Sequence, residues 1–262
     1  MSRYERIRST KALIATLLAA IALFASACDG SSPLGPEAQT DEWTGTGPAV
    51  GDRSGSGQPT RITVMTRNVY VGAAIEEIFS PDLALEEIPF KAAELFGEVL
   101  ATDFAERAGA IAEEVARHRP HLIGLQEISL FRLQVPSDAV LGGTTPATEP
   151  TLDFLAILLD ALDARGLAYQ VASSIENFDA EVPMYFPAAG ALPFADIRLT
   201  DYDVILVRAD VAHAEASASN YAVNLPVVVA GQALELKRGW TSVLATIDGV
   251  TFRFVNTHLE PV

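Results

Sequence analysis

The amino-acid sequence predicts an α/β fold, and two observations carry this prediction. From residue 61 onward the chain reads as a strand, a helix and a second strand, at residues 61–68, 103–119 and 121–125. Further on, four short runs are rich in Val, Ile and Thr, which is typical of strands. These runs are residues 203–207, 226–230, 241–247 and 251–257. A strand–helix–strand unit followed by consecutive strands indicates sheets that are covered by helices.

The first strand is expected at Arg61–Asn68, because Ile62 and Val64 alternate there with more polar residues. The next helical segment is expected within Leu83–Leu100. Pro89 lies inside it and is expected to interrupt the helix, because proline lacks the backbone N–H that a helix interior needs.

A clear helix is expected to begin after Asp103. Asp103 and Glu106 have the spacing of a capping box, in which side chains satisfy the free N–H groups of the first turn. Apolar residues then repeat at helical intervals up to Pro120. The run His121–Leu125 suits a fully buried strand that ends at Gln126-Glu127, so the three elements predict a βαβ-like unit.

The elements that follow are a second helix and a hairpin. Thr151–Arg165 is apolar on nearly all sides, and Gly166 follows at the usual stop position of a helix. Asp248-Gly249 separates two strand-like runs and is a strong hairpin signal. Two stretches are rich in Pro, Gly and Asp and are predicted to be loops, at residues 134–150 and 173–200.

Residues 1–28 have the layout of an export signal. Basic side chains precede the uncharged, mostly apolar run Ala12–Ala27, which is short for a transmembrane helix. The segment Ala25-Ser26-Ala27-Cys28 resembles the lipobox of bacterial lipoproteins, although Ala25 stands where Leu is usual. We therefore expect Cys28 to become the lipidated N-terminus. An ordinary signal with an incidental Cys28, or an uncleaved anchor, is the alternative.

Residues 29–60 are expected to be a disordered linker. Gly, Pro, Ser and Thr supply 19 of these 32 residues, and branched aliphatic side chains are almost absent. Such a segment cannot bury enough apolar surface to offset the entropy lost on ordering. The sequence thus predicts a signal at 1–28, a linker at 29–60 and a folded domain at 61–262, exported and held in the cell envelope by its lipid.

The composition of the chain excludes several classes of protein. The chain has 34 acidic and 18 basic residues, a formal charge of −16, which repels nucleic-acid phosphates and anionic lipid headgroups. Its single cysteine excludes an internal disulfide framework and a zinc cluster built from cysteines. Apolar residues make up 49% of the chain, which is enough for a sizeable core.

Three polar residues follow apolar strands and are candidates for chemistry, namely Asn68, Glu127 and His258. Each also has a structural explanation. Asn68 can start a turn, Glu127 can be a solvated strand end, and His258 can be a hydrogen-bonded structural histidine. Together they place a carboxylate at a sheet edge, where a hard cation such as Mg²⁺ would bind it along with substrate phosphate.

Three segments resemble, in order and spacing, the endonuclease/exonuclease/phosphatase superfamily. They are Thr66–Asn68 with Tyr70 and Gly72-Ala73, then Arg107–Ile128 with its Leu-Gln-Glu, then Asn256–Leu259. The superfamily includes DNase-like nucleases, sphingomyelinases and inositol polyphosphate phosphatases. The resemblance runs from residue 61 to the last residue, and residues 203–208 and 238–240 are similar to one bacterial branch.

This resemblance implies a four-layered α/β sandwich and metal-dependent hydrolysis of a phosphate ester. By the matching motifs, Glu127 would bind Mg²⁺ or Mn²⁺ and Asn68 would help position the metal and the phosphate. His258 would bind the phosphoryl group or assist the leaving oxygen. A cation and a donor placed in this way stabilise charge on phosphoryl oxygens. Arg208 and Arg238 are candidate phosphate contacts, with ordinary surface arginines as the alternative.

Two motifs of the superfamily are missing from this sequence. Its members continue past the histidine motif with Gly-Asp-Phe-Asn and Ser-Asp-His segments, which supply a carboxylate–amide pair and the pair that activates water. This chain stops at Val262, four residues after His258. We therefore expect the sandwich to be incomplete at its C-terminus and to leave a sheet edge uncovered.

Two functions of different classes are open at the level of the sequence. The first is a metal-dependent phosphodiesterase or phosphatase anchored at the cell envelope. The second is a non-catalytic or decayed lipoprotein that keeps the scaffold. For the enzyme, the expected substrate is a phosphate ester of a lipid, a nucleotide or a sugar, and the acidic composition makes nucleic acid less favourable. The motifs point to no protein partner.

Overall fold

The computed structural model describes residues 61–229 and 232–259 of the chain. The chain divides into two units, residues 1–56 and 57–262, and the elements below all belong to the second unit. The predicted signal at 1–28, the lipidation site Cys28 and the predicted linker at 29–60 lie outside the described residues.

The chain begins its folded part with the predicted strand–helix–strand unit. Strand β1 (Val64–Asn68) pairs in parallel with β2 (Leu122–Gln134), in a register that matches Val64 with Leu122 and Asn68 with Gln126. Helices α2 (Ile88–Ala101) and α3 (Phe104–His118) lie between the two strands in sequence. The prediction of a βαβ-like unit is confirmed.

The two helices begin for different local reasons. Pro89 lies in the first turn of α2, where the missing N–H costs no helical hydrogen bond, so the expectation that Pro89 interrupts a helix is wrong. A 3₁₀ helix, η1 (Ile75–Phe79), precedes α2. At α3, the Asp103 side chain accepts a hydrogen bond from the Glu106 N–H at 3.2 Å, which confirms the predicted cap.

The large sheet has the strand order β1-β2-β5-β4, with β3 paired to the far part of β2. Its other elements are β3 (Glu149–Asp153), α4 (Phe154–Asp163), β4 (Tyr169–Tyr185) and β5 (Phe194–Arg208). The predicted loop at residues 173–200 is wrong, because most of it belongs to the antiparallel pair β4 and β5. The stretch 134–150 is mainly loop, with short η2 (Ala139–Leu141) inside it.

A second, antiparallel sheet has the strand order β10-β9-β6. Its strands are β6 (Ala212–Asn220), β9 (Gly239–Ile247) and β10 (Val250–Thr257). Asp248 and Gly249 join β9 to β10 with φ angles of 49° and 79°, so the predicted tight hairpin is confirmed. A separate two-stranded hairpin consists of β7 (Leu225–Val229) and β8 (Gln232–Leu236).

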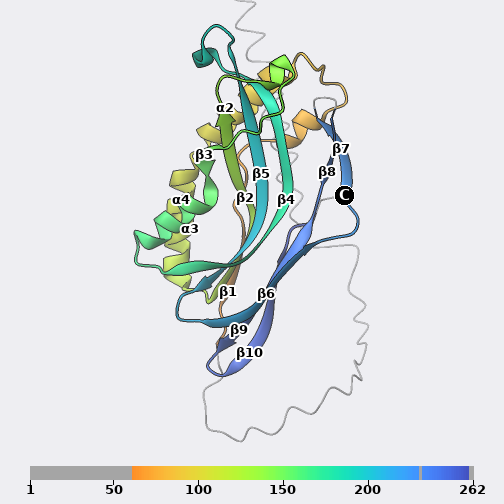
Figure 1. The fold of residues 1–262 in the computed structure, drawn as a ribbon. Helices are drawn as coiled ribbons and strands as arrows, with labels where there is room; N and C mark the ends of the chain where they lie inside the picture. Colours follow the sequence, from red (N-terminus) through yellow and green to blue (C-terminus); the bar gives the residue numbers. More distant parts are fainter. Residues whose placement is uncertain (1–60, 230–231, 260–262) are drawn as a thin grey trace, which may run out of the picture. The chain divides into compact units, whose positions relative to one another are not determined.

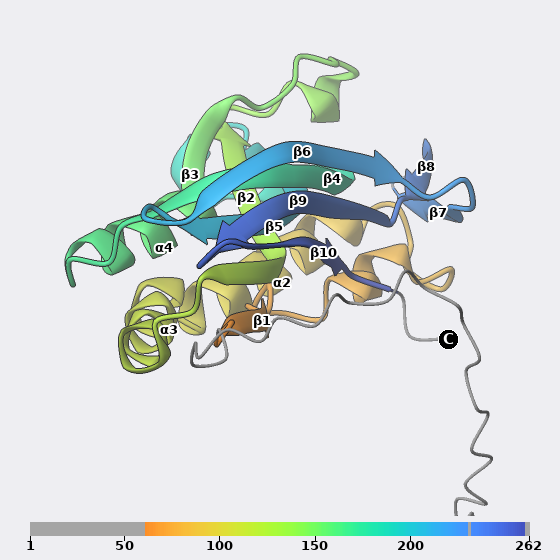
Figure 2. The ribbon, with the colours of Figure 1, turned by 90° about the horizontal axis from the view of Figure 1, so that it is seen from below.

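The large sheet is covered by helices on one face and by the second sheet on the other. Figure 1 shows α2, α3 and α4 together on one side of the large sheet, and Figure 2 shows β6, β9 and β10 side by side as a separate layer. The mixed α/β fold with two packed sheets is confirmed. Residues 61–229 and 232–259 supply three layers, and the helices among them cover the large sheet only.

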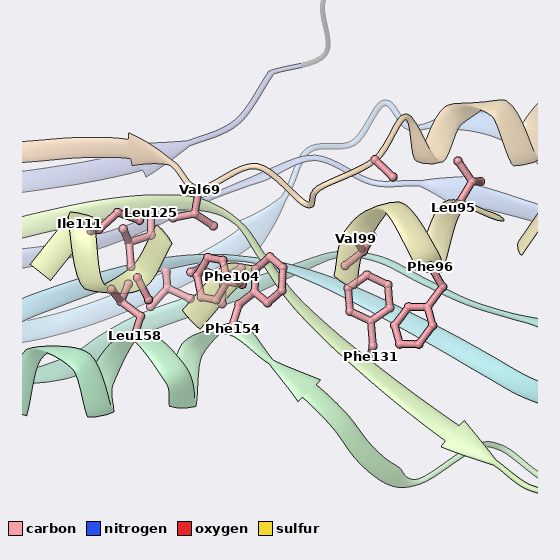
Figure 3. Close-up of a cluster of buried hydrophobic side chains, with 14 of the residues drawn as sticks. Val69, Leu95, Phe96, Val99, Phe104, Ile111, Leu125, Phe131, Phe154 and Leu158 are labelled. Carbon is pink, nitrogen blue, oxygen red and sulfur yellow. The ribbon is translucent and has the colours of Figure 1, made fainter. Parts of the chain in front are cut away.

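The layer between helices and sheet is filled by apolar side chains (Figure 3). Phe104 of α3 and Phe154 of α4 stack with ring centroids 3.7 Å apart, and Phe131 of β2 lies against Phe154 at 6.2 Å. Phe154 and Leu125 are completely buried. Burial of side chains this large contributes about 2–3 kcal/mol each, so this layer is a main source of the fold's stability.

Candidate functional site

Glu127 lies in the middle of a strand and not at its end. Strand β2 continues to Gln134, so the expectation that it ends at Gln126-Glu127 is wrong. The register of β2 against β5 shifts between Leu125 and Ile128, which leaves Gln126 and Glu127 opposite one residue of β5. Glu127 has φ = 59°, a left-handed backbone that is rare for this residue type. This β-bulge turns the Glu127 side chain away from the regular pleat.

A second bulge flanks the same part of β5 from the other side. The register of β4 against β5 shifts between Glu176 and Phe178, so Asn177 is the extra residue. Asn177 is completely buried. Bulges on both neighbours therefore bring polar side chains to Asp201 and Asp203 of β5.

Asn68, the last residue of β1, and Glu127, in the bulge of β2, are held together by hydrogen bonds. The Asn68 Nδ2 donates to Glu127 Oε1 at 2.6 Å, and the Val71 N–H donates to Glu127 Oε2 at 2.7 Å. Asn68 Oδ1 accepts from the Tyr70 N–H at 2.8 Å. Each Glu127 oxygen has a fixed donor and a remaining lone pair, so the carboxylate is oriented before any ligand binds.

Arg107 of α3 fixes the loop that carries these donors. Its guanidinium donates to the carbonyl oxygens of Val69 and Tyr70, and also to the Thr102 carbonyl at 3.1 Å. It lies 4.9 Å from the centroid of the Phe104 ring. Burial lowers the pKa of Arg107, although an arginine stays charged at neutral pH. The apolar core and the polar site are thus joined through one side chain.

Asn256 of β10 joins the two sheets beside the bulge. Its Nδ2 donates to the carbonyl oxygens of Leu125 at 2.9 Å and Val204 at 3.2 Å, and its Oδ1 accepts from Gln126 Nε2 at 2.6 Å. A Cβ on Gly124 would lie 2.7 Å from Asn256 Oδ1, so glycine is needed there for this close approach. These bonds set the position of the chain two residues before His258.

His258 follows β10 and is half-buried in a cleft. Burial lowers its pKa, and the positive charge of Arg238 lowers it further. Within the described part of the chain, the buried Nδ1 of His258 has no hydrogen-bond partner. His258 is therefore neutral at physiological pH and keeps the capacity to accept a proton or a hydrogen bond.

Two carboxyl groups at the site were not predicted from the sequence, namely the largely buried Asp201 and the fully buried Asp203. Burial raises the pKa of Asp201 to about 7, and the charge of Asp203 adds to this effect. Burial also raises the pKa of Asp203 to about 6. Arg238 lies 3.9 Å from an Asp201 oxygen. The signal that could have found them is the alternation of two acids with Tyr202 immediately before the apolar run of β5.

Asp203 and Asn177 are buried without regular hydrogen bonds. Among residues 61–229 and 232–259, neither carboxylate oxygen of Asp203 and neither polar side-chain atom of Asn177 has a hydrogen-bond partner of ordinary geometry. The Asn177 amide and the His258 backbone still lie close enough to lower the pKa of Asp203 against the effect of burial. Unsatisfied buried polar atoms are costly and typical of a site that binds something else.

The cleft between these elements has a volume of about 660 Å³. Its polar lining includes side chains from five different segments, namely Asn68, Glu127, Asp201, Arg238 and His258. The structure therefore brings together four of the residues singled out in the sequence. Their catalytic and binding roles stay predictions.

Arg208 is not brought to this cleft. It lies at the end of β5 beside Val207, which pairs with Leu122 at the beginning of β2, whereas the bulge lies further along β2. Its guanidinium is 2.6 Å from Asp210 and also donates to the Arg119 carbonyl at 2.6 Å. The antiparallel direction of β5, which the sequence did not show, carries Arg208 away from Glu127.

Of the three carboxylates that line the cleft, those of Glu127 and Asp201 lie among its other polar groups and suit a hard divalent cation. Oxygen ligands are the ones that Mg²⁺ and Mn²⁺ prefer, and Mg²⁺ commonly takes one or two carboxylates together with phosphate and water. In the residues that the structure describes, no three or more His, Cys, Asp and Glu side chains form a group that could hold a metal ion. The donor set that fits such an ion is Glu127 and Asp201, both in the cleft.

No protein-family model matches the sequence, and no curated protein is similar to it. Solved structures do give matches. A truncated form of TDP2 from Caenorhabditis elegans matches with 15% identity over 62% of this chain and 42% of that chain, at a TM-score of 0.32. Another crystal structure of TDP2 matches with 14% identity over 79% of this chain and 39% of that chain, at a TM-score of 0.34. An endonuclease/exonuclease/phosphatase family protein from Leptotrichia buccalis C-1013-b also matches, with 13% identity over 76% of this chain and 55% of that chain, at a TM-score of 0.36. The chain spans about two fifths to just over half of these proteins.

Proposed function

We propose that the chain is a metal-dependent hydrolase of phosphate esters, of the endonuclease/exonuclease/phosphatase type. The observation that carries the proposal is the cleft in which Asn68, Glu127, Asp201, Arg238 and His258 meet. The sequence motifs around Asn68, Glu127 and His258 support it independently, because they come from three distant segments that the fold brings to one place.

In the reaction, a water oxygen bonds to phosphorus and the ester P–O bond breaks. The alcohol leaves with a proton and the phosphate keeps the water oxygen. Mg²⁺ or Mn²⁺, when bound by Glu127 and Asp201, would supply positive charge to the phosphoryl oxygens. Asn68 and the Val71 N–H hold the Glu127 carboxylate in a single orientation.

The other cleft residues act on the phosphate and the leaving group. Arg238 places a positive charge in the cleft, where its guanidinium would donate to a non-bridging phosphate oxygen. His258, which is neutral at physiological pH, would hydrogen-bond the phosphoryl group or exchange a proton with the leaving oxygen. Asn256 holds β10 and so fixes where His258 lies.

The test is hydrolysis of bis(p-nitrophenyl) phosphate by the full chain with Mg²⁺ or with EDTA. We expect activity with the metal only, and a loss of about 10²–10³-fold in Glu127→Gln, because the variant keeps the shape but not the charge. Glu149→Gln, an exposed glutamate of β3, is the matched control and is expected to keep full activity. Equal metal-dependent rates in the two variants would contradict the role of Glu127, and the absence of a metal-dependent rate in the wild type would favour a non-catalytic protein.

We also propose that Cys28 carries the lipid anchor and that the protein is exported to the cell envelope. The support is the sequence of residues 1–28 alone. Among the described residues, no helix is long and apolar enough to cross a membrane. In a bacterial host, we expect the wild type in the membrane fraction and Cys28→Ser in the soluble fraction. Membrane association of both forms would contradict lipidation at this residue.

A further inference from the structure

The cleft that holds the polar residues also has an extended apolar wall. Part of the wall comes from η1 and the large sheet, and part comes from the β7–β8 hairpin, which contacts η1 and β4. The apolar lining consists mainly of Ile75, Phe79, Phe178, Leu199, Leu225, Val227 and Leu236. A phosphate site alone does not need so many apolar side chains.

The polar and apolar parts of the cleft lie on the same face of one strand. Asp201 and Leu199 of β5 are two residues apart, so their side chains point to the same side of the sheet. Two residues of a strand span about 7 Å. A ligand with its phosphate at Asp201 therefore meets the apolar wall within the length of a few covalent bonds.

The wall continues into a second, wholly apolar cavity under η1 and α2. This cavity measures about 60 Å³ and lies among Ala92, Leu95, Phe96 and neighbouring apolar residues. It shares four lining residues with the cleft, namely Ile75, Phe79, Phe178 and Leu199. A small cavity without polar groups is not a place for ordered water, but it accepts the end of an alkyl group.

The charges at the cleft disfavour ligands with several phosphates. Glu76, Glu127 and Asp201 line it, and Arg238 is the one Lys or Arg among the described residues that does so. The whole chain carries a formal charge of −16. Tight binding of a nucleic acid requires several phosphate contacts from basic side chains, which this surface does not offer.

We propose that the substrate is an amphiphilic phosphate ester with a single phosphate, whose apolar chain lies along the wall formed by Ile75, Phe79, Phe178 and Leu199. This inference rests on the proposed hydrolase function and narrows its substrate. The phosphate lies at the polar end of the cleft, and the chain runs over Leu199 toward the apolar cavity. Sugar phosphates lack an apolar group for this wall, and the edges of a nucleobase carry polar atoms that the wall leaves without partners.

Two measurements on the full chain test the proposal, and both compare a short with a long alkyl group. The first is the binding of methyl phosphate and hexyl phosphate, measured by isothermal titration calorimetry in the presence of Mg²⁺. The second is the hydrolysis of methyl p-nitrophenyl phosphate and hexyl p-nitrophenyl phosphate below their micelle concentrations. For the wild type, we expect the hexyl compound to bind about tenfold more tightly and to have a KM about tenfold lower, because added methylenes leave water.

Variants of the wall are expected to remove the preference for the hexyl compounds. In Leu199→Asn and in Ile75→Asn, the hexyl-to-methyl ratios of Kd and KM should fall to within about twofold of one, because a polar amide faces the chain. Leu199→Met keeps an apolar side chain and should keep the hexyl-to-methyl ratios of the wild type. Leu141→Asn changes a leucine that is 78% exposed in η2, away from the cleft, and should leave the ratio unchanged. Thermal unfolding confirms that each variant is folded.

The outcomes separate this inference from the proposed function. A preference for the hexyl compounds in binding that the wall variants remove supports the inference even if no ester is hydrolysed. Hydrolysis with equal KM for both esters overturns the inference and leaves the hydrolase function intact. A hexyl preference that persists in both wall variants also overturns it. If neither phosphate binds and the two esters have equal KM, the inference fails, and the hydrolysis of bis(p-nitrophenyl) phosphate decides the proposed function on its own.

Discussion

The two faces of the large sheet are built in different ways. On the helix side, residues such as Phe104, Phe131 and Phe154 fill space, and polar side chains are few. On the other side, the packing of the second sheet is interrupted by Asn256 and Asp203, both buried and both polar. The comparison teaches that the helix side stabilises the fold by burying apolar surface. The packing on the other side instead depends on individual polar atoms that define a site.

The largest effect is expected on the helix face. Phe154→Ala removes a completely buried ring that stacks on Phe104, and should lower the free energy of unfolding by about 3–5 kcal/mol. Urea unfolding followed by circular dichroism measures it. Phe90→Ala, at a phenylalanine that is 54% exposed, is the matched control with an expected loss below about 1 kcal/mol. Similar losses of unfolding free energy in both variants would show that the buried aromatic side chains of the helix side are not a main source of stability.

An intermediate effect is expected at the bridge between the sheets. Asn256→Ala removes the side-chain donor to the carbonyl oxygens of Leu125 and Val204, and it removes one of the two acceptors of the Gln126 amide. We expect a loss of about 1–3 kcal/mol in stability, together with a lower rate of ester hydrolysis, because His258 loses its support. Thr251→Ser, in an exposed position of the same strand, keeps the hydroxyl that bonds to Thr246 and should change neither. An unchanged rate in Asn256→Ala would show that the bridge does not position the site.

An effect of opposite sign is expected at Asp203. Burial raises the pKa of Asp203 to about 6, so the folded protein keeps a proton that the unfolded chain releases near pH 4. The wild type therefore loses stability relative to Asp203→Asn as the pH rises from about 4 to about 6. At pH 8 in EDTA, the variant should be more stable by about 2 kcal/mol. Equal unfolding free energies of the wild type and Asp203→Asn at pH 8 would show that the buried Asp203 carboxylate does not destabilise the fold.

The helix face could be predicted from the sequence better than the site face. Helical periodicity and the cap at Asp103 are local signals, and so is the Asp248-Gly249 turn. Strand β4 was missed because acidic residues, Asn177 and Pro183 interrupt its apolar residues, and the segment becomes a strand only by pairing with β5. Pairing across a sheet depends on partners far away in the sequence, and composition does not show it.

The site could be predicted in part. Motifs indicated Asn68, Glu127 and His258, and the structure places them in one cleft. The bulge at Glu127 could not be predicted, because a bulge is a property of the register between two strands. Asp201 was overlooked for the same reason, since its neighbours in space come from other strands. Arg208 and Arg238 could not be distinguished until the direction of β5 was known.

The hydrogen bonds of Asn256 also have a consequence for the order in which the chain folds. Asn256 bonds to Gln126 and Leu125, which precede it by 130 and 131 residues. Contacts between such distant residues close large loops and form slowly compared with the contacts within α3 or the β9–β10 hairpin. We therefore expect the helices and hairpins to form early in refolding, and the cleft to take its final shape in the slowest step, when β10 docks on β2.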